Sequence, residues 1–174
     1  MIIRPQPDEY APFYGGYINR VPEGADLAAL LARQPGDLQT LLSPVSDQQA
    51  NARPKSSEWS IKEMLGHICD AERVFAYRAT RFARNDNATL PGFDQDEFVK
   101  ATDFNTRTLA DLLEEFSLQR RANLVLLKSL TAEELERVGT ASGNPMSSRA
   151  AFYVMAGHVL HHVESLRTDY HVGA

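Results

Sequence analysis

The amino-acid sequence predicts an all-α protein built as a four-helix bundle. Four segments place apolar residues at helical spacing, helix-capping residues precede them, and no segment shows the alternation typical of a β-strand. Long amphipathic helices bury their apolar faces by packing against one another, and four of them make a bundle. With 174 residues, 43% of them hydrophobic, the chain is long enough for a single domain, residues 1–174, with a sizeable core.

The first 24 residues are predicted to form an extended arm. Prolines interrupt any helix in this segment, and tyrosines offer aromatic rings for packing: Pro5, Pro7, Pro12, Pro22, Tyr10, Tyr14 and Tyr17. We expect these aromatic side chains to pack onto the helical body and to line or close a pocket.

The first two helices carry clear start signals. Asp26 can cap the first helix, although Pro35-Gly36 should kink that helix or split it. Ser60 and Glu63 form a capping box, which starts a second helix that keeps its apolar spacing to about residue 84.

The second half of the chain is predicted to contain two more long helices. The third runs from about residue 108 to about residue 130, and Thr131 caps a short helical piece after it. Residues 139–145 are predicted to be a loop. One residue of the pair Ser147-Ser148 then caps the last helix, which runs to about residue 170.

Residues 85–105 are predicted to form a long loop, which includes Leu90-Pro91-Gly92-Phe93. A loop of this length inside a compact domain usually has a function. We therefore expect it to form the rim of a pocket.

The composition limits the partners and the compartment. A net charge of -5 argues against nucleic acid, because phosphate binding needs a basic surface. The single cysteine, Cys69, excludes an intrachain disulfide and fits a reducing cytoplasm. The opening residues lack the apolar stretch of a signal peptide, and no run reaches membrane-spanning length. We expect a cytoplasmic protein that binds a small molecule rather than nucleic acid or a membrane.

Three histidines are the strongest candidates for a functional site. His158 and His162 lie one helical turn apart in the last helix, so their side chains point toward the same place. On a helical wheel both lie at the edge of the apolar arc, whereas His161 lies farther round. His67 lies beside the apolar stripe of the second helix, and the fold can bring it to the pair.

These histidines predict a mononuclear metal site. Neutral imidazole is the commonest protein ligand for a transition metal, and three imidazoles leave coordination positions for water or substrate. We expect one divalent ion, zinc or nickel, because both suit imidazole. The sequence lacks the Glu-x-x-His pairs of a di-metal bundle. The alternative is that the histidines are hydrogen-bonded residues of the core.

Three neighbouring side chains are candidates to support such a site. Asp70 points outward on the wheel, where it can orient a ligand or bind water, whereas Glu72 falls within the apolar stripe. His161 is the third candidate. A glycine also precedes a histidine in both helices, at Gly66 and Gly157, although a glycine costs a helix about 1 kcal/mol. We interpret this cost as the sign of a close approach between two backbones.

Arginines recur along the second helix, at Arg73, Arg78, Arg81 and Arg84. We expect a solvated face with ion pairs, and the alternative is a site for an anionic substrate group. Cys69 points to another side of this helix and is expected to be a small buried residue rather than a nucleophile or ligand.

Several motifs together resemble the DinB-like (DinB/YfiT) superfamily over almost the whole chain. The matching segments are Tyr17-Ile18-Asn19-Arg20-Val21-Pro22-Glu23-Gly24, Glu58-Trp59-Ser60-Ile61-Lys62-Glu63, Gly66-His67-Ile68, Asp70-Ala71-Glu72-Arg73, Arg81-Phe82-Ala83-Arg84, Leu90-Pro91-Gly92-Phe93 and Gly157-His158-Val159-Leu160-His161-His162. Each motif alone is short, but their combination is specific.

The resemblance implies a four-helix bundle of the up-up-down-down type, often dimeric, with a metal held by three histidines. Matched position by position, these ligands are His67, His158 and His162, the same three that the helical wheel selects. Members of the superfamily include thiol S-transferases that use low-molecular-weight thiols such as bacillithiol or mycothiol, and many others have no known reaction. The expected function is that of a metal-dependent transferase or hydrolase of a small molecule, working as a homodimer. The alternative is a non-catalytic metal-binding or stress-response module.

Overall fold

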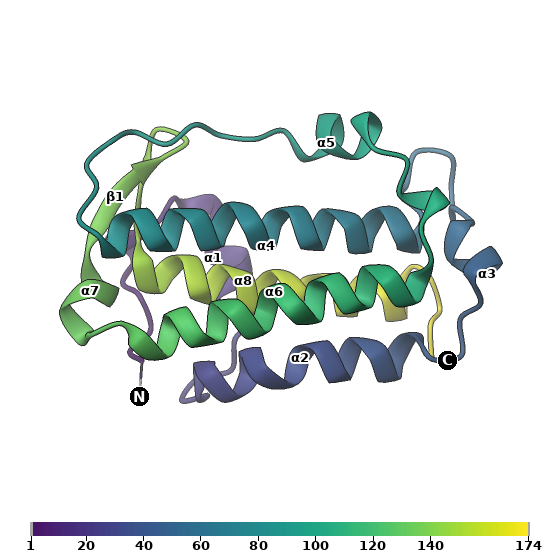
Figure 1. The fold of residues 1–174 in the computed structure, drawn as a ribbon, viewed down its shortest axis with the longest axis horizontal. Helices are drawn as coiled ribbons and strands as arrows, with labels where there is room; N and C mark the ends of the chain where they lie inside the picture. The colour runs from purple at the N-terminus through teal and green to yellow at the C-terminus, as the bar shows by residue number, and fades with distance from the viewer. Residues whose placement is uncertain (1, 174) are drawn as a thin grey trace.

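Four long helices lie side by side in the computed structural model, which describes residues 2–173 (Figure 1). They are α2 (Leu27–Leu42), α4 (Ile61–Ala83), α6 (Leu109–Ser129) and α8 (Ser148–Thr168). Their bounds agree with the predicted ones to within a few residues, and the four-helix bundle is confirmed. Within residues 2–173, no helix is long and apolar enough to cross a membrane.

The core fills the space between these helices. Helix α4 contacts α6 and α8, and α2 contacts the same two helices. Each helix contributes large apolar side chains, among which Leu31, Phe82, Phe116 and Phe152 are at most 2% exposed. Burial of such a side chain stabilises the fold by about 1.5–3 kcal/mol.

The helix directions differ from the up-up-down-down order that the family resemblance implies. Helices α2 and α8 run in one direction, and α4 and α6 run in the other (Figure 1). Because α4 and α6 are parallel, the chain between them must return along the length of the bundle. This crossover, residues 84–108, is not the continuous loop that the sequence predicts, because it contains α5 (Gln95–Ala101) and the 3-10 helix η3 (Phe104–Thr106).

The predicted helix starts are confirmed by their hydrogen bonds. Asp26 accepts from two backbone N–H groups in the first turn of α2. Ser60 accepts from the backbone N–H of Glu63, whose carboxylate accepts in turn from the Ser60 N–H. Of the two candidate caps for α8, Ser147 is the one that accepts from the helix backbone.

Pro35-Gly36 is predicted to kink or split the first helix; α2 continues through Pro35, so the split does not occur. A proline inside a helix frees the carbonyl group four residues earlier, here that of Leu31. Nη1 of Arg120 lies 3.4 Å from this oxygen and donates to it, and the same arginine pairs with Glu72 and donates to the side chain of Gln34. A buried polar network therefore joins α2, α4 and α6.

The N-terminal segment packs on the bundle as predicted, but it is not extended throughout. It contains η1 (Pro7–Glu9), η2 (Pro12–Tyr14) and α1 (Gly15–Ile18). Ile18 and Val21 are almost completely buried, which fixes this segment on the body.

Different contacts explain the two glycines, Gly66 and Gly157, inside the helices. A Cβ on Gly157 would lie 1.9 Å from the backbone oxygen of Tyr17, so the predicted close approach of two backbones is confirmed there. At Gly66 the prediction is wrong, because a Cβ there would lie 2.4 Å from the ring of Phe104, a side chain.

A short β-hairpin replaces the loop predicted for residues 139–145. Strands β1 (Val138–Ala141) and β2 (Asn144–Ser147) pair antiparallel. The two turn residues, Ser142 and Gly143, both have positive φ values, of 53° and 74°, as a tight hairpin turn requires. Strands of four residues are too short for their alternation to stand out in the sequence. The remaining helices are α3 (Asp47–Asn51) and α7 (Ala132–Glu136).

Candidate metal centre

His67, His158 and His162 meet between α4 and α8. Because these helices are antiparallel neighbours, a residue near the start of α4 lies beside residues in the second half of α8 (Figure 1). Nε2 of His158 is 2.9 Å from Nε2 of His67 and 3.0 Å from Nε2 of His162. One ring nitrogen from each histidine lies within 4.8 Å of the other two.

The three rings are buried and held in place by other aromatic side chains. His67, His158 and His162 are 3%, 5% and 7% exposed. The ring of Trp59 lies 4.8 Å from that of His67, and the edge-on ring of Tyr17 lies 5.3 Å from that of His158, both measured between centroids. Such contacts restrict the ring orientations before any ligand binds.

The environment keeps these imidazoles neutral. Burial, together with the charge of His161, lowers the pKa of His67 to about 4. Burial, and then the neighbouring histidines, lower the pKa of His158 and the pKa of His162 well below the ordinary value. At neutral pH each ring therefore has a lone pair available, which is the form that binds metals.

Hydrogen bonds among the three histidines cannot satisfy all three Nε2 atoms. A neutral ring nitrogen either carries one proton or offers one lone pair, so Nε2 of His158 can make one such bond while it faces two other Nε2 atoms. A cation accepts a lone pair from each of them at once. Nitrogens held at about 2.1 Å from one ion lie about 3.0–3.4 Å apart at octahedral or tetrahedral angles, so this donor set fits a divalent transition metal.

The three predicted supporting residues differ in their positions. His161 is half-buried, and its ring lies 5.0 Å from that of His162, between centroids. Asp70 is half-buried and pairs with an arginine one turn away. Glu72 is buried, but Arg120 binds both of its carboxylate oxygens, at 2.8 and 2.9 Å. Glu72 therefore belongs to the buried polar network that joins α2, α4 and α6.

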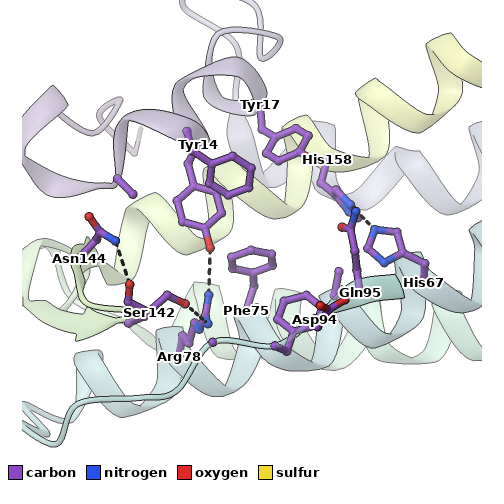
Figure 2. Close-up of a pocket in the computed structure, with 16 residues that line it drawn as sticks. Tyr14, Tyr17, His67, Phe75, Arg78, Asp94, Gln95, Ser142, Asn144 and His158 are labelled. Carbon is purple, nitrogen blue, oxygen red and sulfur yellow. Dashed lines mark hydrogen bonds between the residues drawn. The ribbon is translucent and has the colours of Figure 1, made fainter. Parts of the chain in front are cut away.

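A cavity of about 600 Å³ begins at His67 and His158 and extends along α4 (Figure 2). Its walls are largely aromatic, and polar side chains gather at the two ends. The lining residues are Ala11, Phe13, Tyr14, Tyr17, His67, Ala71, Phe75, Arg78, Gly92, Phe93, Asp94, Gln95, Ala141, Ser142, Asn144 and His158. The volume is within the range of small-molecule sites.

The predicted contributors to this pocket are largely confirmed. Tyr14 and Tyr17 come from the N-terminal segment, and residues 92–95 come from the crossover. Tyr10 does not belong to the lining and instead pairs with Met146 through a backbone bridge.

Four polar residues of the cavity were not singled out on the sequence: Asp94, Gln95, Ser142 and Asn144. Ser142 and Asn144 come from the hairpin, and Gln95 points from the start of α5 toward the histidine end (Figure 2). The Ser142-Gly143 pair, between two short runs, is a hairpin signal that could have revealed the two hairpin residues. Gln95 lies in the segment predicted to form the rim, but no local signal distinguishes it from its neighbours, because only the path of the crossover places it over the site.

The arginines of α4 are of two kinds. Three of them form the expected ion pairs: Arg73 with Asp70 and Glu115, Arg81 with Asp86, and Arg84 with Glu134. Arg78 is different, because it is 1% exposed and lines the cavity. Cys69 is buried as expected, and burial raises the pKa of its thiol.

The protein is thus a four-helix bundle in which three buried histidines converge beside a cavity. The chain belongs to the DinB superfamily, whose sequence model matches residues 30–166.

Curated relatives and a solved structure are similar to this chain. "Putative metal-dependent hydrolase GK0616" of Geobacillus kaustophilus is 27% identical over 140 residues, which cover 76% of this chain and 78% of the relative. A protein of Halalkalibacterium halodurans with the same description is 25% identical over 136 residues, with the same two coverages. A solved structure is that of YfiT from Bacillus subtilis, described as a probable metal-dependent hydrolase with an unusual four-helix bundle topology. The match covers 97% of this chain and 92% of the YfiT chain. It has a TM-score of 0.73 at 14% identity, which supports the fold.

Proposed function

We propose that this protein is a metal-dependent hydrolase of a small molecule, with one divalent ion held by His67, His158 and His162. The observation that carries the proposal is the convergence of three buried Nε2 atoms, two of them on residues, His67 and His158, that line a cavity of about 600 Å³. The descriptions of the two relatives as metal-dependent hydrolases agree with it.

Some residues of the chain would bind the ion, and others shape the site around it. A divalent ion on three neutral imidazoles supplies Lewis acidity, which polarises a substrate carbonyl group and lowers the pKa of water. Trp59 and Tyr17 fix the imidazole rings, and the aromatic walls of the cavity exclude bulk water from the reacting bond. Zinc and nickel are the ions we expect, and the cytoplasm is the expected compartment.

Two other functions use the same residues. Transfer of a group to a low-molecular-weight thiol needs the same metal but leaves the thiol, rather than water, joined to the product. A non-catalytic metal-binding module needs the histidines but not the cavity. The cavity beside His67 and His158 favours catalysis on a substrate of matching size.

Metal content tests the proposal first. Protein purified without an affinity tag is dialysed against zinc or nickel and analysed by mass spectrometry. We expect about one ion per chain in the wild type and in His161→Ala, and loss of the ion in His158→Ala. His161 is the matched control because it lies beside His162 but outside the group of three. Wild-type protein that binds no ion would overturn the proposal.

Activity separates the three functions. Metal-loaded protein is assayed with a panel of small esters and amides, with and without a low-molecular-weight thiol. We expect hydrolysis that disappears in the metal-free protein and in His158→Ala. Turnover only with thiol would indicate a transferase. Metal binding with no turnover over the whole panel would favour a binding module.

A further inference from the structure

Arg78 is a buried charge that the metal chemistry does not use. Among residues 2–173, three arginines are at most 9% exposed: Arg78, Arg120 and Arg149. Arg120 pairs with Glu72, and Arg149 pairs with Glu9. Within residues 2–173, no carboxylate pairs with Arg78, whose hydrogen bonds all go to neutral oxygens. A buried cation of this kind is unfavourable unless an anion binds beside it.

The surroundings of Arg78 are rich in hydrogen-bond donors. Its Nη1 donates to the hydroxyl of Tyr14 at 3.1 Å, and its Nη2 donates to the carbonyl of Pro91 at 3.0 Å and to the hydroxyl of Ser142 at 3.1 Å. Both hydroxyls accept from the arginine and keep their own O–H free to donate. In the described part of the chain, neither O–H has an acceptor within reach.

The acidic residue of the cavity lining does not neutralise this cluster. Asp94 is the carboxylate among the lining residues, and its Oδ1 accepts from the backbone N–H groups of Asp96 and Glu97 at the start of α5. It caps that helix and, within residues 2–173, forms no ion pair with Arg78. The charge of the cluster therefore remains positive.

The cluster lies at the far end of the cavity from the histidines (Figure 2). Arg78 follows His67 by eleven positions on α4, which places the two Cα atoms about 16 Å apart along the axis and about 20° apart around it. Between them the cavity floor is apolar and consists of Ala71 and Phe75. The cavity thus has a cationic end, an apolar middle and a metal-binding end.

We propose that Arg78, with the hydroxyls of Tyr14 and Ser142, binds a carboxylate group of the substrate. One guanidinium matches the single charge of a carboxylate, and the two hydroxyls can donate to its oxygens. The substrate class is an elongated molecule with a carboxylate at one end, an apolar middle and the bond to be cleaved at the other end. The position of that bond rests on the proposed hydrolase function, whereas the carboxylate site does not.

The test compares octanoate with octanamide, which differ in the charged group and share the apolar chain. Both are titrated into metal-loaded wild-type protein by calorimetry. We expect octanoate to bind at least about tenfold more tightly, as a charge-assisted hydrogen bond in a buried site provides. Arg78→Gln should remove this preference, Arg78→Lys should retain part of it, and Arg81→Gln, on the same helix, should leave it unchanged. Equal binding of the two compounds to the wild type would overturn the proposal.

Three further outcomes separate this inference from its competitors. If Arg78→Gln weakens both compounds equally, Arg78 only ties the arm, crossover and hairpin together, and the proposal fails. The titration is repeated on a His158→Gln, His162→Gln variant without metal. A preference for octanoate that persists there and depends on Arg78 supports the carboxylate site even if the hydrolase proposal fails. A preference that disappears there shows that octanoate binds the metal and overturns the carboxylate site.

Discussion

At the scale of single residues, the buried histidines couple the stability of the metal-free protein to pH. Unfolded histidines take up protons below a pKa of about 6.5, whereas His67 stays neutral to about pH 4, and His158 and His162 stay neutral well below their ordinary pKa. Between these values the unfolded state binds more protons than the folded state. The free energy of unfolding therefore falls as the pH drops from 6.5 toward 4.

We expect the free energy of unfolding to fall by up to about 1.4 kcal/mol per pH unit for each of the three histidines. Urea unfolding in the presence of a chelator, at several values between pH 7.5 and 5, measures it. His158→Gln should make the dependence shallower by about one proton. Identical slopes in the wild type and His158→Gln would contradict the burial argument.

The ion pair between Glu72 and Arg120 gives a second prediction for a single residue. Both side chains are at most 2% exposed, so Glu72→Ala leaves a buried guanidinium without its partner. We expect the free energy of unfolding to fall by about 3–5 kcal/mol. Glu97→Ala, which breaks the exposed pair with Lys100, should change the free energy of unfolding far less, because solvent screens that pair. Chemical denaturation of the two variants checks the difference.

At the scale of elements, α1 and α8 approach so closely that only glycine fits at one position. A Cβ on Gly157 would overlap the backbone oxygen of Tyr17, so Gly157→Ala must push the segment that carries Tyr17 away from α8. We expect it to destabilise the protein by about 1–3 kcal/mol and, because Tyr17 contacts His158, to weaken metal binding.

Gly36 on α2 provides the matched control. A Cβ there would meet nothing within 4 Å, and alanine is the better helix former. Gly36→Ala should therefore stabilise the protein by about 0.5–1 kcal/mol without changing metal affinity. Thermal unfolding and metal titration of both variants measure these opposite effects. A stable Gly157→Ala protein would refute the close packing of α1 on α8.

At the scale of the whole molecule, homodimer formation remains a prediction. Most leucines of α2 and α6 are buried in the bundle, but Leu118 and Val125, two turns apart on α6, are 50% and 71% exposed. We expect light scattering at micromolar concentration to give twice the mass of the chain. Val125→Glu should shift that mass toward the monomer, because it places a charge in the apolar patch. A monomeric wild type would contradict the expectation.

Much of the fold could be predicted because its signals are local. Asp26, Ser60, Thr131 and Ser147 cap helices by contacts within three residues, and the apolar spacing of the long helices identifies the faces they bury. The helix directions could not be read in this way. They depend on a crossover whose path is set by packing, and the short hairpin and α5 are too short to give a periodic signal.

The sequence by itself determined the four helices and selected His67, His158 and His162, because helical periodicity fixes which side chains share a face. Only the tertiary structure decided what lies beside them. It paired Glu72 with Arg120, placed Ser142 of the hairpin and Gln95 of the crossover in the cavity, and buried Arg78 with hydrogen bonds to neutral oxygens. These arrangements depend on contacts between segments far apart in the chain, and no local pattern of residues encodes such contacts.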